Sequence, residues 1–385
     1  MHNKIPGDGR ELCVTVHDAV EVRAEDGRYV NNCNVSAFIS NLPTLPGCSH
    51  AVDTKQFSTR EASGSTSQAA NVSEALEMGA TALLVDEDVS AANFMARDGR
   101  MRALVMDESI TPLLYRVNGL YHTHGISSVV VVGGVGDWLD VPNTVILLNR
   151  YLASDATKKA ASVSYQFSYG HVQYAGRGVV HRLEWDKEGT PISRRMTNDF
   201  AKSYPDNIGV SLMEGGHVVS IHEEIDDDTA IIDDDDAGCI DMSRCEQLLG
   251  KKNQLYACGL CVAWILRMAK KNPRLGIKDL ITKLEESMDE AGGLFPLLVG
   301  PGANSSASHC LSSSTAWVHL VESVGFVYRP RKHEIFMAVT RMRGIALEAL
   351  PVIDDGSDTA AESEAERKKR ELAELWNARR KNRIT

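Results

Sequence analysis

The first constraint on the fold is an apolar run, Ala80–Val85, that ends in the acidic residues Asp86, Glu87 and Asp88. A short apolar run bounded by polar residues is typical of a buried strand. Three further strand-like runs lie within the first 150 residues: Leu12–Val16, Ser127–Val132 and Thr144–Leu148. The stretches between them that look helical are Gln68–Met78 and about Pro112 to His122. Because strands alternate with helices, the sequence predicts an α/β fold with a covered, mostly parallel sheet.

Carboxylates at the end of such a strand point to a ligand site. Asp86 and Glu87 are expected at the C-terminal edge of the sheet, where α/β proteins bind their ligands. In P-loop nucleoside triphosphatases the first acid at this place holds Mg²⁺ and the second polarises the attacking water. For the two acids taken alone, the alternative is a surface turn, because many strands end at an acidic residue.

A second candidate site precedes this strand. Residues 62–71 read Ala-Ser-Gly-Ser-Thr-Ser-Gln-Ala-Ala-Asn and lead into a predicted helix. Glycine and small hydroxyl residues at a helix N-terminus form an anion site, because free backbone N–H groups and the positive end of the helix dipole face the ligand. The alternative is an ordinary serine or threonine N-cap. Ser63 precedes Asp86 by 23 positions, so a phosphate-type loop, one helix and an acidic strand end follow one another.

Five segments carry a resemblance to a known family. They are Ile5–Glu11, Phe57–Asn71, Leu84–Asp88, Asn93–Asp98 and Gly133–Asp137. Together they resemble the predicted ATPases of the ABC class, a non-transporter family, over residues 1–150. Residues 329–335 continue the resemblance more loosely within residues 240–347. The resemblance implies a P-loop NTPase-like core with a mostly parallel sheet, followed by a mainly helical C-terminal domain.

The resemblance also implies ATP and Mg²⁺ as cofactors. Asp86 is implied to bind Mg²⁺ through water and Glu87 to activate the attacking water. The residues implied at the nucleotide are Ser63, Gly64, Ser65, Thr66, Ser67, Gln68, Ser90, Gly133 and Gly134. The segment that begins at Ser63 resembles the ABC signature, which in a homodimer closes over the nucleotide of the partner. Gly134 takes the position of the switch histidine of ABC ATPases.

One part of a P-loop ATPase is missing from the sequence. No Gly-x-x-x-x-Gly-Lys-Ser/Thr segment occurs, and the only Gly-Lys pair is Gly250-Lys251. That loop supplies the backbone cradle, the lysine and the Mg²⁺-binding hydroxyl for the phosphates. We therefore expect a truncated form that lacks the N-terminal domain and the loop, and that cannot hydrolyse ATP alone. The alternative is a natural chain without the loop.

The net charge of −11 does not exclude a polyanionic ligand. Ten acids lie within residues 223–241 and six within residues 354–366, and neither window holds Lys or Arg, so the rest of the chain has more bases than acids. One family member with this organisation is an RNA-binding subunit of the kinetoplastid mitochondrial RNA-editing accessory complex. The second hypothesis is RNA binding with the ATPase fold as scaffold or clamp. The basic residues expected to contact RNA are Arg177, Arg182, Arg194, Arg195, Arg329, Arg331 and Lys332. The alternative is a solvated surface of mixed charge.

Four parts are expected along the chain. They are the ATPase core at 1–150, an irregular or β-rich connector with an acidic insert at 151–238, a helical domain at 239–350 and a charged tail at 351–385. No apolar run reaches the roughly 20 residues that span a bilayer, and no secretion signal is recognisable. We expect an intracellular protein, mitochondrial if it follows the kinetoplastid member and otherwise cytoplasmic. Cys258 and Cys261 are interpreted as small apolar residues on a buried helix, with a redox or metal pair as the alternative.

Overall fold

The computed structural model divides the chain into two compact units, Met1–Leu350 and Pro351–Thr385. The described residues all belong to the first unit and are 14–40, 42–44, 51–105, 108–167, 192–205, 208–213, 215–223, 237–245, 252–293 and 328–350. The expected core, connector and helical domain all fall within this unit. The charged tail and residues 224–236 of the acidic insert lie outside the described residues.

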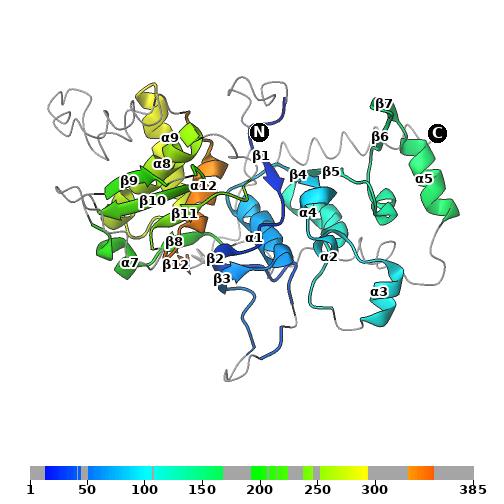
Figure 1. Ribbon diagram of the computed structural model, residues 1–385, viewed down its shortest axis with the longest axis horizontal. Helices are drawn as coiled ribbons and strands as arrows, with labels where there is room; N and C mark the ends of the chain where they lie inside the picture. The colour runs from blue at the N-terminus through cyan, green and yellow to red at the C-terminus, as the bar shows by residue number, and fades with distance from the viewer. Residues whose placement is uncertain are drawn as a thin grey trace, which may run out of the picture. The chain divides into compact units, whose positions relative to one another are not determined.

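A three-stranded parallel sheet lies at the centre of the α/β part (Figure 1). Its strands are β1 (Ala19–Val22), β4 (Ala82–Asp86) and β5 (Ser127–Val131), in the order β1-β4-β5. The register places both Val22 and Val130 beside Val85. This sheet confirms the predicted α/β fold and the strands expected near Ala80 and Ser127.

The first strand begins later than the sequence pattern indicated. Residues 14–16 belong to no strand, and Val14 and Val16 are exposed. The strand forms instead at β1, where Val20 and Val22 are fully buried. The prediction of a strand at Leu12–Val16 is therefore wrong for residues 14–16, because burial against the core, and not the short apolar run before it, selects the residues that pair.

The parallel sheet has one covered face in the described part of the chain. That face carries Val20, Val22, Leu83 and Val85, all buried. The helix α1 (Gly64–Glu77) contacts β1, and α4 (Val117–His124) contacts β5. On the other face, Val129 and Val131 of β5 are 58% and 59% exposed. We call this exposed part of the second face, at β5, the open face. The prediction of a covered sheet holds for the first face and fails for the open face of the described residues.

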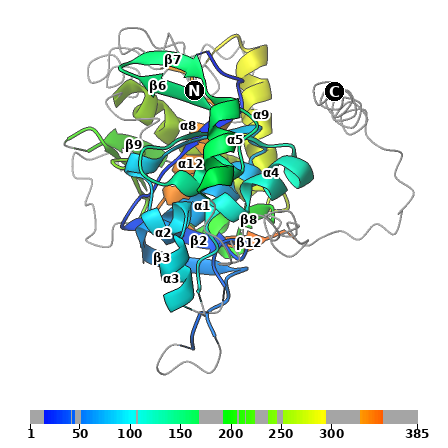
Figure 2. The ribbon, with the colours of Figure 1, turned by 90° about the vertical axis from the view of Figure 1, so that its right-hand side faces the viewer.

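Two antiparallel hairpins accompany the parallel sheet. One joins β2 (Arg28–Cys33) to β3 (Phe57–Ala62), and the other joins β6 (Ile146–Asn149) to β7 (Leu152–Asp155). Figure 2 shows the β6–β7 hairpin and α5 (Thr157–Gln166) on the side facing the viewer. The apolar run at Thr144–Leu148 was expected in the parallel sheet, and this expectation is wrong, because β6 turns back on β7 at once.

The C-terminal part of the unit combines helices with a small antiparallel sheet. The helices are α7 (Asn198–Ser203), α8 (Lys252–Lys271), α9 (Ile277–Glu290) and α12 (Lys332–Arg341). The strands are β9 (Ile208–Leu212), β10 (Val218–Glu223) and β11 (Cys239–Asp241), with a separate pair β8 (Arg194–Met196) and β12 (Leu347–Ala349). The region is helical as predicted, with the added strands.

Helix α8 packs closely on the β9–β10 strands. A Cβ atom on Gly259 would lie only 2.6 Å from Val219 Cγ1, so the glycine permits this close approach. Cys258 and Cys261 on the same helix are fully buried, and burial raises the pKa of the Cys258 thiol well above its usual range. Both cysteines thus occupy the core of a buried helix, as the apolar interpretation predicted.

Short elements complete the described chain. They are η2 (Glu87–Val89), α2 (Ala92–Met95), α3 (Gly99–Leu104), η3 (Leu113–Tyr115) and η4 (Gly136–Asp140). No helix in the described ranges has the length and apolar character needed to cross a membrane.

Candidate nucleotide site at the strand ends

The acid pair lies where β4 ends. Asp86 is the last residue of β4, and Glu87 opens the short helix η2. The Asp86 carboxylate accepts a hydrogen bond from the Asp88 backbone N–H at 3.0 Å, which caps η2 and fixes the direction of the chain. Both carboxylates therefore sit at the C-terminal edge of the parallel sheet, the edge at which α/β proteins bind ligands.

Glu87 contacts the loop that follows the neighbouring strand. Its Oε2 atom accepts hydrogen bonds from the backbone N–H groups of Gly133, at 2.6 Å, and Gly134, at 2.8 Å. The pairing of Asp86 with Val131 across β4 and β5 brings these segments together, although they are 46 and 47 positions apart. The structure thus brings Glu87 into contact with two glycines that are distant from it in the sequence.

The N-terminus of α1 has a regular cap. The Ser63 hydroxyl accepts a hydrogen bond from the Thr66 backbone N–H at 3.4 Å. Ser63 is exposed, and Gly64 and Thr66 are partly exposed. Ser67 is buried, and its hydroxyl accepts a hydrogen bond from the Glu25 backbone N–H at 2.8 Å. The exposed start of the helix can meet a ligand, whereas Ser67 binds the chain after β1.

Gln68 connects α1 to the segment that follows β4. It is fully buried, and its side-chain amide donates a hydrogen bond to the Ser90 hydroxyl at 2.8 Å and accepts one from the Ala91 N–H at 2.9 Å. The Ser90 hydroxyl in turn donates to the Asp86 carbonyl at 2.6 Å. Gln68 and Ser90 therefore tie the signature-like helix to the acidic strand end through internal hydrogen bonds.

Residues 23–27, which the sequence analysis did not single out, also belong to this edge. The Ala24 N–H donates to the Val89 carbonyl at 3.0 Å, and a Cβ atom on Gly64 would lie 3.2 Å from the Asp26 carboxylate. Burial raises the pKa of Glu21 on β1, Arg23 opposes this shift, and the charge of Asp86 adds to it. An acidic sequence directly after an apolar strand, as at Asp86, is the signal that could have indicated this segment.

The acids at this edge suit a nucleotide-bound Mg²⁺ ion. Within the described ranges no group of three His, Cys, Asp or Glu side chains could hold a metal by itself. Asp86 offers one carboxylate at this edge, and Mg²⁺ in phosphoryl-transfer sites is held by one or two carboxylates together with substrate phosphates. The donor set therefore fits an ion that arrives with the nucleotide.

A buried ion network lies against the C-terminal half of α1. Its members are Arg28, Arg194 and Arg341 with Glu25, Glu74 and Glu77. Arg341 binds Glu25 through two nitrogens, at 2.5 and 2.9 Å, and Arg28 pairs with Glu74. Burial alone would raise the pKa of Glu25, but the charge of Arg341 outweighs it and lowers the pKa to about 2. The network links α1 to β8 and α12 across the chain.

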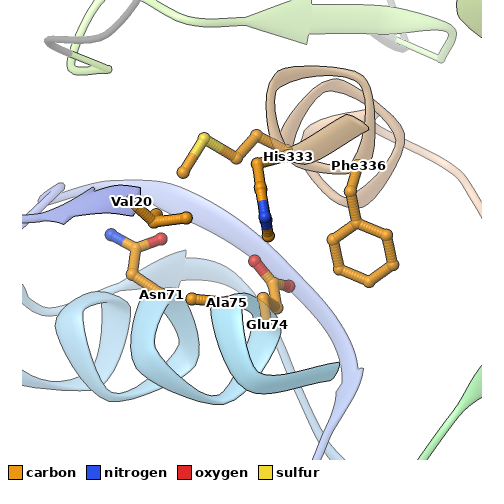
Figure 3. Close-up of a pocket in the computed structure, with 7 residues that line it drawn as sticks. Val20, Asn71, Glu74, Ala75, His333 and Phe336 are labelled. Atoms are coloured by element: carbon orange, nitrogen blue, oxygen red, sulfur yellow. The ribbon is translucent and has the colours of Figure 1, made fainter. Parts of the chain in front are cut away.

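A small cavity lies beside this network, between α1 and α12 (Figure 3). His333 of α12 and Glu74 of α1 point toward each other across it. Burial lowers the pKa of His333, and the neighbouring Lys332 and Arg331 charges lower it further, so the ring is neutral near pH 7. The cavity is about large enough for one water molecule, so it cannot hold a nucleotide.

The basic residues expected at an RNA surface are placed differently. Arg194 is 2% exposed and pairs with Glu77 at 2.9 Å, and Arg331 is buried against Glu334. The partly exposed ion pairs are Arg195 with Glu348, Arg329 with Asp289 and Lys332 with Asp18. Arg177 and Arg182 lie outside the described residues. In this conformation Arg194 and Arg331 cannot reach a phosphate backbone, because their partners bury them.

Comparison with known families agrees with the α/β fold of the N-terminal half of the chain. Residues 1–182, just under half of the chain, match the P-loop domain of the ABC_ATPase family model. No curated protein matches the chain. The matched part is thus similar to a P-loop ATPase domain, and it contains Asp86, Glu87, Gly133, Gly134 and the start of α1.

Proposed function

We propose that the chain supplies the hydrolytic half of an ABC-class ATP site. The observation that carries the proposal is the adjacent pair Asp86 and Glu87 at the C-terminal edge of the parallel sheet, with Glu87 held by the Gly133 and Gly134 amides. The family match over residues 1–182 supports nucleotide binding and hydrolysis as the chemistry of that edge.

The roles of the two acids follow from their positions. Asp86 would hold, through water, the Mg²⁺ ion that arrives with the nucleotide, and that ion would supply positive charge at the phosphates. Glu87 orients the attacking water and accepts its proton while the water oxygen bonds to the γ-phosphorus and the bond to the β-phosphate oxygen breaks. The products are ADP and inorganic phosphate.

The open face supports a place for the missing phosphate-binding loop. Parallel strands are normally covered on both faces, and β5 pairs on one side only among the described strands. We consider a further strand that pairs with β5 and is connected to β1. That connection would cross the sheet from the β5 side toward β1, opposite to the direction of the β1–β4 and β4–β5 connections. A right-handed crossover in that direction places its helix on the face opposite α1, which is the open face. We propose that a strand–loop–helix unit N-terminal to β1 carries the phosphate-binding loop there.

The start of α1 suits a shared site in a homodimer. Ser63, Gly64, Ser65 and Thr66 stand at the N-terminus of α1, where the first backbone N–H groups have no helical carbonyl partner. The Ser63 hydroxyl already binds the Thr66 N–H, and the Ser65 side chain is buried. We propose that these four residues contact the γ-phosphate of a nucleotide bound by a second copy of the chain. Ser67, Gln68 and Ser90 would then position this start against β4 and not touch the nucleotide themselves.

The decisive test is Glu87→Gln in protein that carries the phosphate-binding loop. ATP hydrolysis is expected to fall by about 10²- to 10⁴-fold, because a general base is lost, while ATP affinity is retained. Asp88→Asn, which changes the neighbouring exposed acid, is the matched control and should leave hydrolysis near wild type. Undiminished hydrolysis by the Glu87 variant would reject the proposal.

RNA binding remains a proposal that follows from the resemblance alone. Because Arg194 and Arg331 are buried, the described residues proposed to contact RNA are the partly exposed Arg195, Arg329 and Lys332. Phosphate contacts would make RNA affinity fall as salt rises. Filter binding of single-stranded RNA at two salt concentrations, with Lys332→Ala for comparison, tests it, and affinity independent of salt would reject it.

A further inference from the structure

The loop after β5 presents two consecutive backbone donors to a single atom. The N–H groups of Gly133 and Gly134 both point at Glu87 Oε2, at 2.6 and 2.8 Å. Successive N–H groups that converge in this way form a small anion-binding nest. Here the anion is a carboxylate of the same chain, held between the ends of two paired strands.

The second carboxylate oxygen is left available. Within the described residues, Glu87 Oε1 has no hydrogen-bond partner, and it lies over Gly134, where an added Cβ would come within 3.2 Å of it. A carboxylate whose one oxygen is bound and whose other oxygen is accessible has a defined orientation. Such an orientation is what a group that accepts a proton from a positioned water requires.

We propose that Gly133 and Gly134 are positioning residues for Glu87, which fix Oε2 so that Oε1 accepts the proton of the attacking water. This inference rests on the proposed ATPase function and deepens it. The proton passes from water to Glu87 Oε1 as the water oxygen bonds to the γ-phosphorus and the β-phosphate oxygen leaves. Two main-chain amides after β5 thus orient Glu87, at a place where Gly134 stands in the position of the switch histidine.

The two glycines differ in what a methyl group would meet. A Cβ on Gly134 would press on Oε1 at 3.2 Å, which is tighter than ordinary van der Waals contact, whereas a Cβ on Gly133 would lie 4.0 Å from Oε2. Neither residue has the positive φ angle that disfavours alanine. Gly134→Ala and Gly133→Ala therefore form a matched pair in which only the first displaces the carboxylate.

The first experiment measures steady-state ATP hydrolysis by both variants in protein that carries the phosphate-binding loop. A displacement of about 1 Å can cost about 100-fold in rate, and the contact at 3.2 Å requires a shift of a few tenths of an ångström. Gly134→Ala is therefore expected to lower kcat by about 3- to 10-fold. KM for ATP should stay within about 2-fold, since ground-state binding does not use this contact. Gly133→Ala keeps the backbone N–H and adds a Cβ 4.0 Å from Oε2, so it should lower kcat less than Gly134→Ala does. An unchanged kcat in Gly134→Ala, or an equal loss in the two variants, would overturn the proposal.

The second experiment needs no hydrolysis and uses the 385-residue chain. Amide hydrogen exchange at Gly133 and Gly134 is followed by NMR with ¹⁵N-glycine, and the two alanine variants assign the signals. Losing a hydrogen bond of about 1.4 kcal/mol raises exchange about 10-fold, so Glu87→Ala should accelerate both amides by that factor.

The two experiments separate this inference from the proposed function. Exchange that is equally fast with and without the Glu87 carboxylate would overturn the positioning contact itself. Faster exchange in Glu87→Ala, together with full hydrolysis in Glu87→Gln, would reject the ATPase role of Glu87 and with it the positioning role, while the contact stands. Faster exchange with a selective loss of kcat in Gly134→Ala supports the inference.

Discussion

The two flanks of the parallel sheet differ in how they are completed. On the β1 side, the buried ion network joins α1 to residues as distant in sequence as Arg194 and Arg341, and all six of its charged members are buried. On the β5 side, the open face leaves Val129 and Val131 more than half exposed. Within the described residues, the network flank is therefore packed and charge-paired, whereas the open face carries two exposed valines.

The contrast between the two flanks separates contacts that contribute strongly to stability from contacts that contribute little. Buried ion pairs are costly to break because the remaining charge stays in a medium of low polarity. Exposed valines on an open face contribute little until something packs on them. Substitutions in the network should therefore weigh heavily on the free energy of unfolding, and substitutions on the open face should weigh lightly.

The largest effect is expected from Arg341→Met, which removes the two hydrogen bonds that Arg341 donates to Glu25 and leaves only the one from the Asn71 amide. The free energy of unfolding should fall by about 3–5 kcal/mol, the cost of an uncompensated buried charge. Urea titration followed by circular dichroism measures it. Arg195→Met breaks the partly exposed pair with Glu348 and serves as the control, with a loss of at most about 1 kcal/mol. Equal losses in the two variants would contradict the contrast.

A loss of stability in acid is the next largest effect. The folded pKa of Glu25 is about 2, below the ordinary value of 4.5, because the Arg341 charge outweighs burial. Its contribution, about 3 kcal/mol, is therefore present above pH 4.5 and disappears as the pH falls toward 2. Unfolding free energies measured across that window should show this slope in the wild type and a shallower one in Arg341→Met. Identical slopes in the two proteins would contradict the assignment of the lowered Glu25 pKa to the Arg341 charge.

Part of this architecture could be predicted from the sequence because its signals are local. Helical spacing and the Ser63 cap indicated α1, and an apolar run ending in Asp86 indicated β4. The β6–β7 hairpin was missed because its turn, Arg150-Tyr151, has positive φ angles at both residues. Turns of that shape are signalled by Asn or Gly, and neither Arg nor Tyr gives the signal.

The buried arginines were missed for a different reason. Arg194 and Arg195 are adjacent in sequence and look like one basic cluster. Alternation along β8 sends Arg194 into the core and leaves Arg195 partly exposed, and the acids that bind Arg194 lie more than 100 positions earlier. Which of two neighbouring charges is buried depends on tertiary pairing, so composition alone could not separate them. The Glu87 contact with Gly133 likewise arises from strand pairing.

A medium effect is expected from Gln68→Leu, at the link between α1 and the segment that follows β4. The variant removes the donor to the Ser90 hydroxyl, which still donates to the Asp86 carbonyl, and the acceptor of the Ala91 N–H, and it should cost about 1–3 kcal/mol. Combined with Ser90→Ala, it should show a coupling energy of at least about 0.5 kcal/mol, since the two residues share one hydrogen bond. Chemical denaturation of the single and double variants gives this value. Additive losses would mean that the link does not hold the strand end.

The smallest effect is expected from Val131→Thr on the open face. In the 385-residue chain this change should alter the free energy of unfolding by less than about 0.5 kcal/mol, as at other exposed sites. Val85→Thr, on the covered face, is the matched comparison and should cost about 1–3 kcal/mol, because its hydroxyl would be buried without a partner. If a strand–loop–helix unit covers the open face, the cost of Val131→Thr should rise toward that of Val85→Thr in protein that carries the unit. A cost that stays near zero there would place the phosphate-binding loop elsewhere.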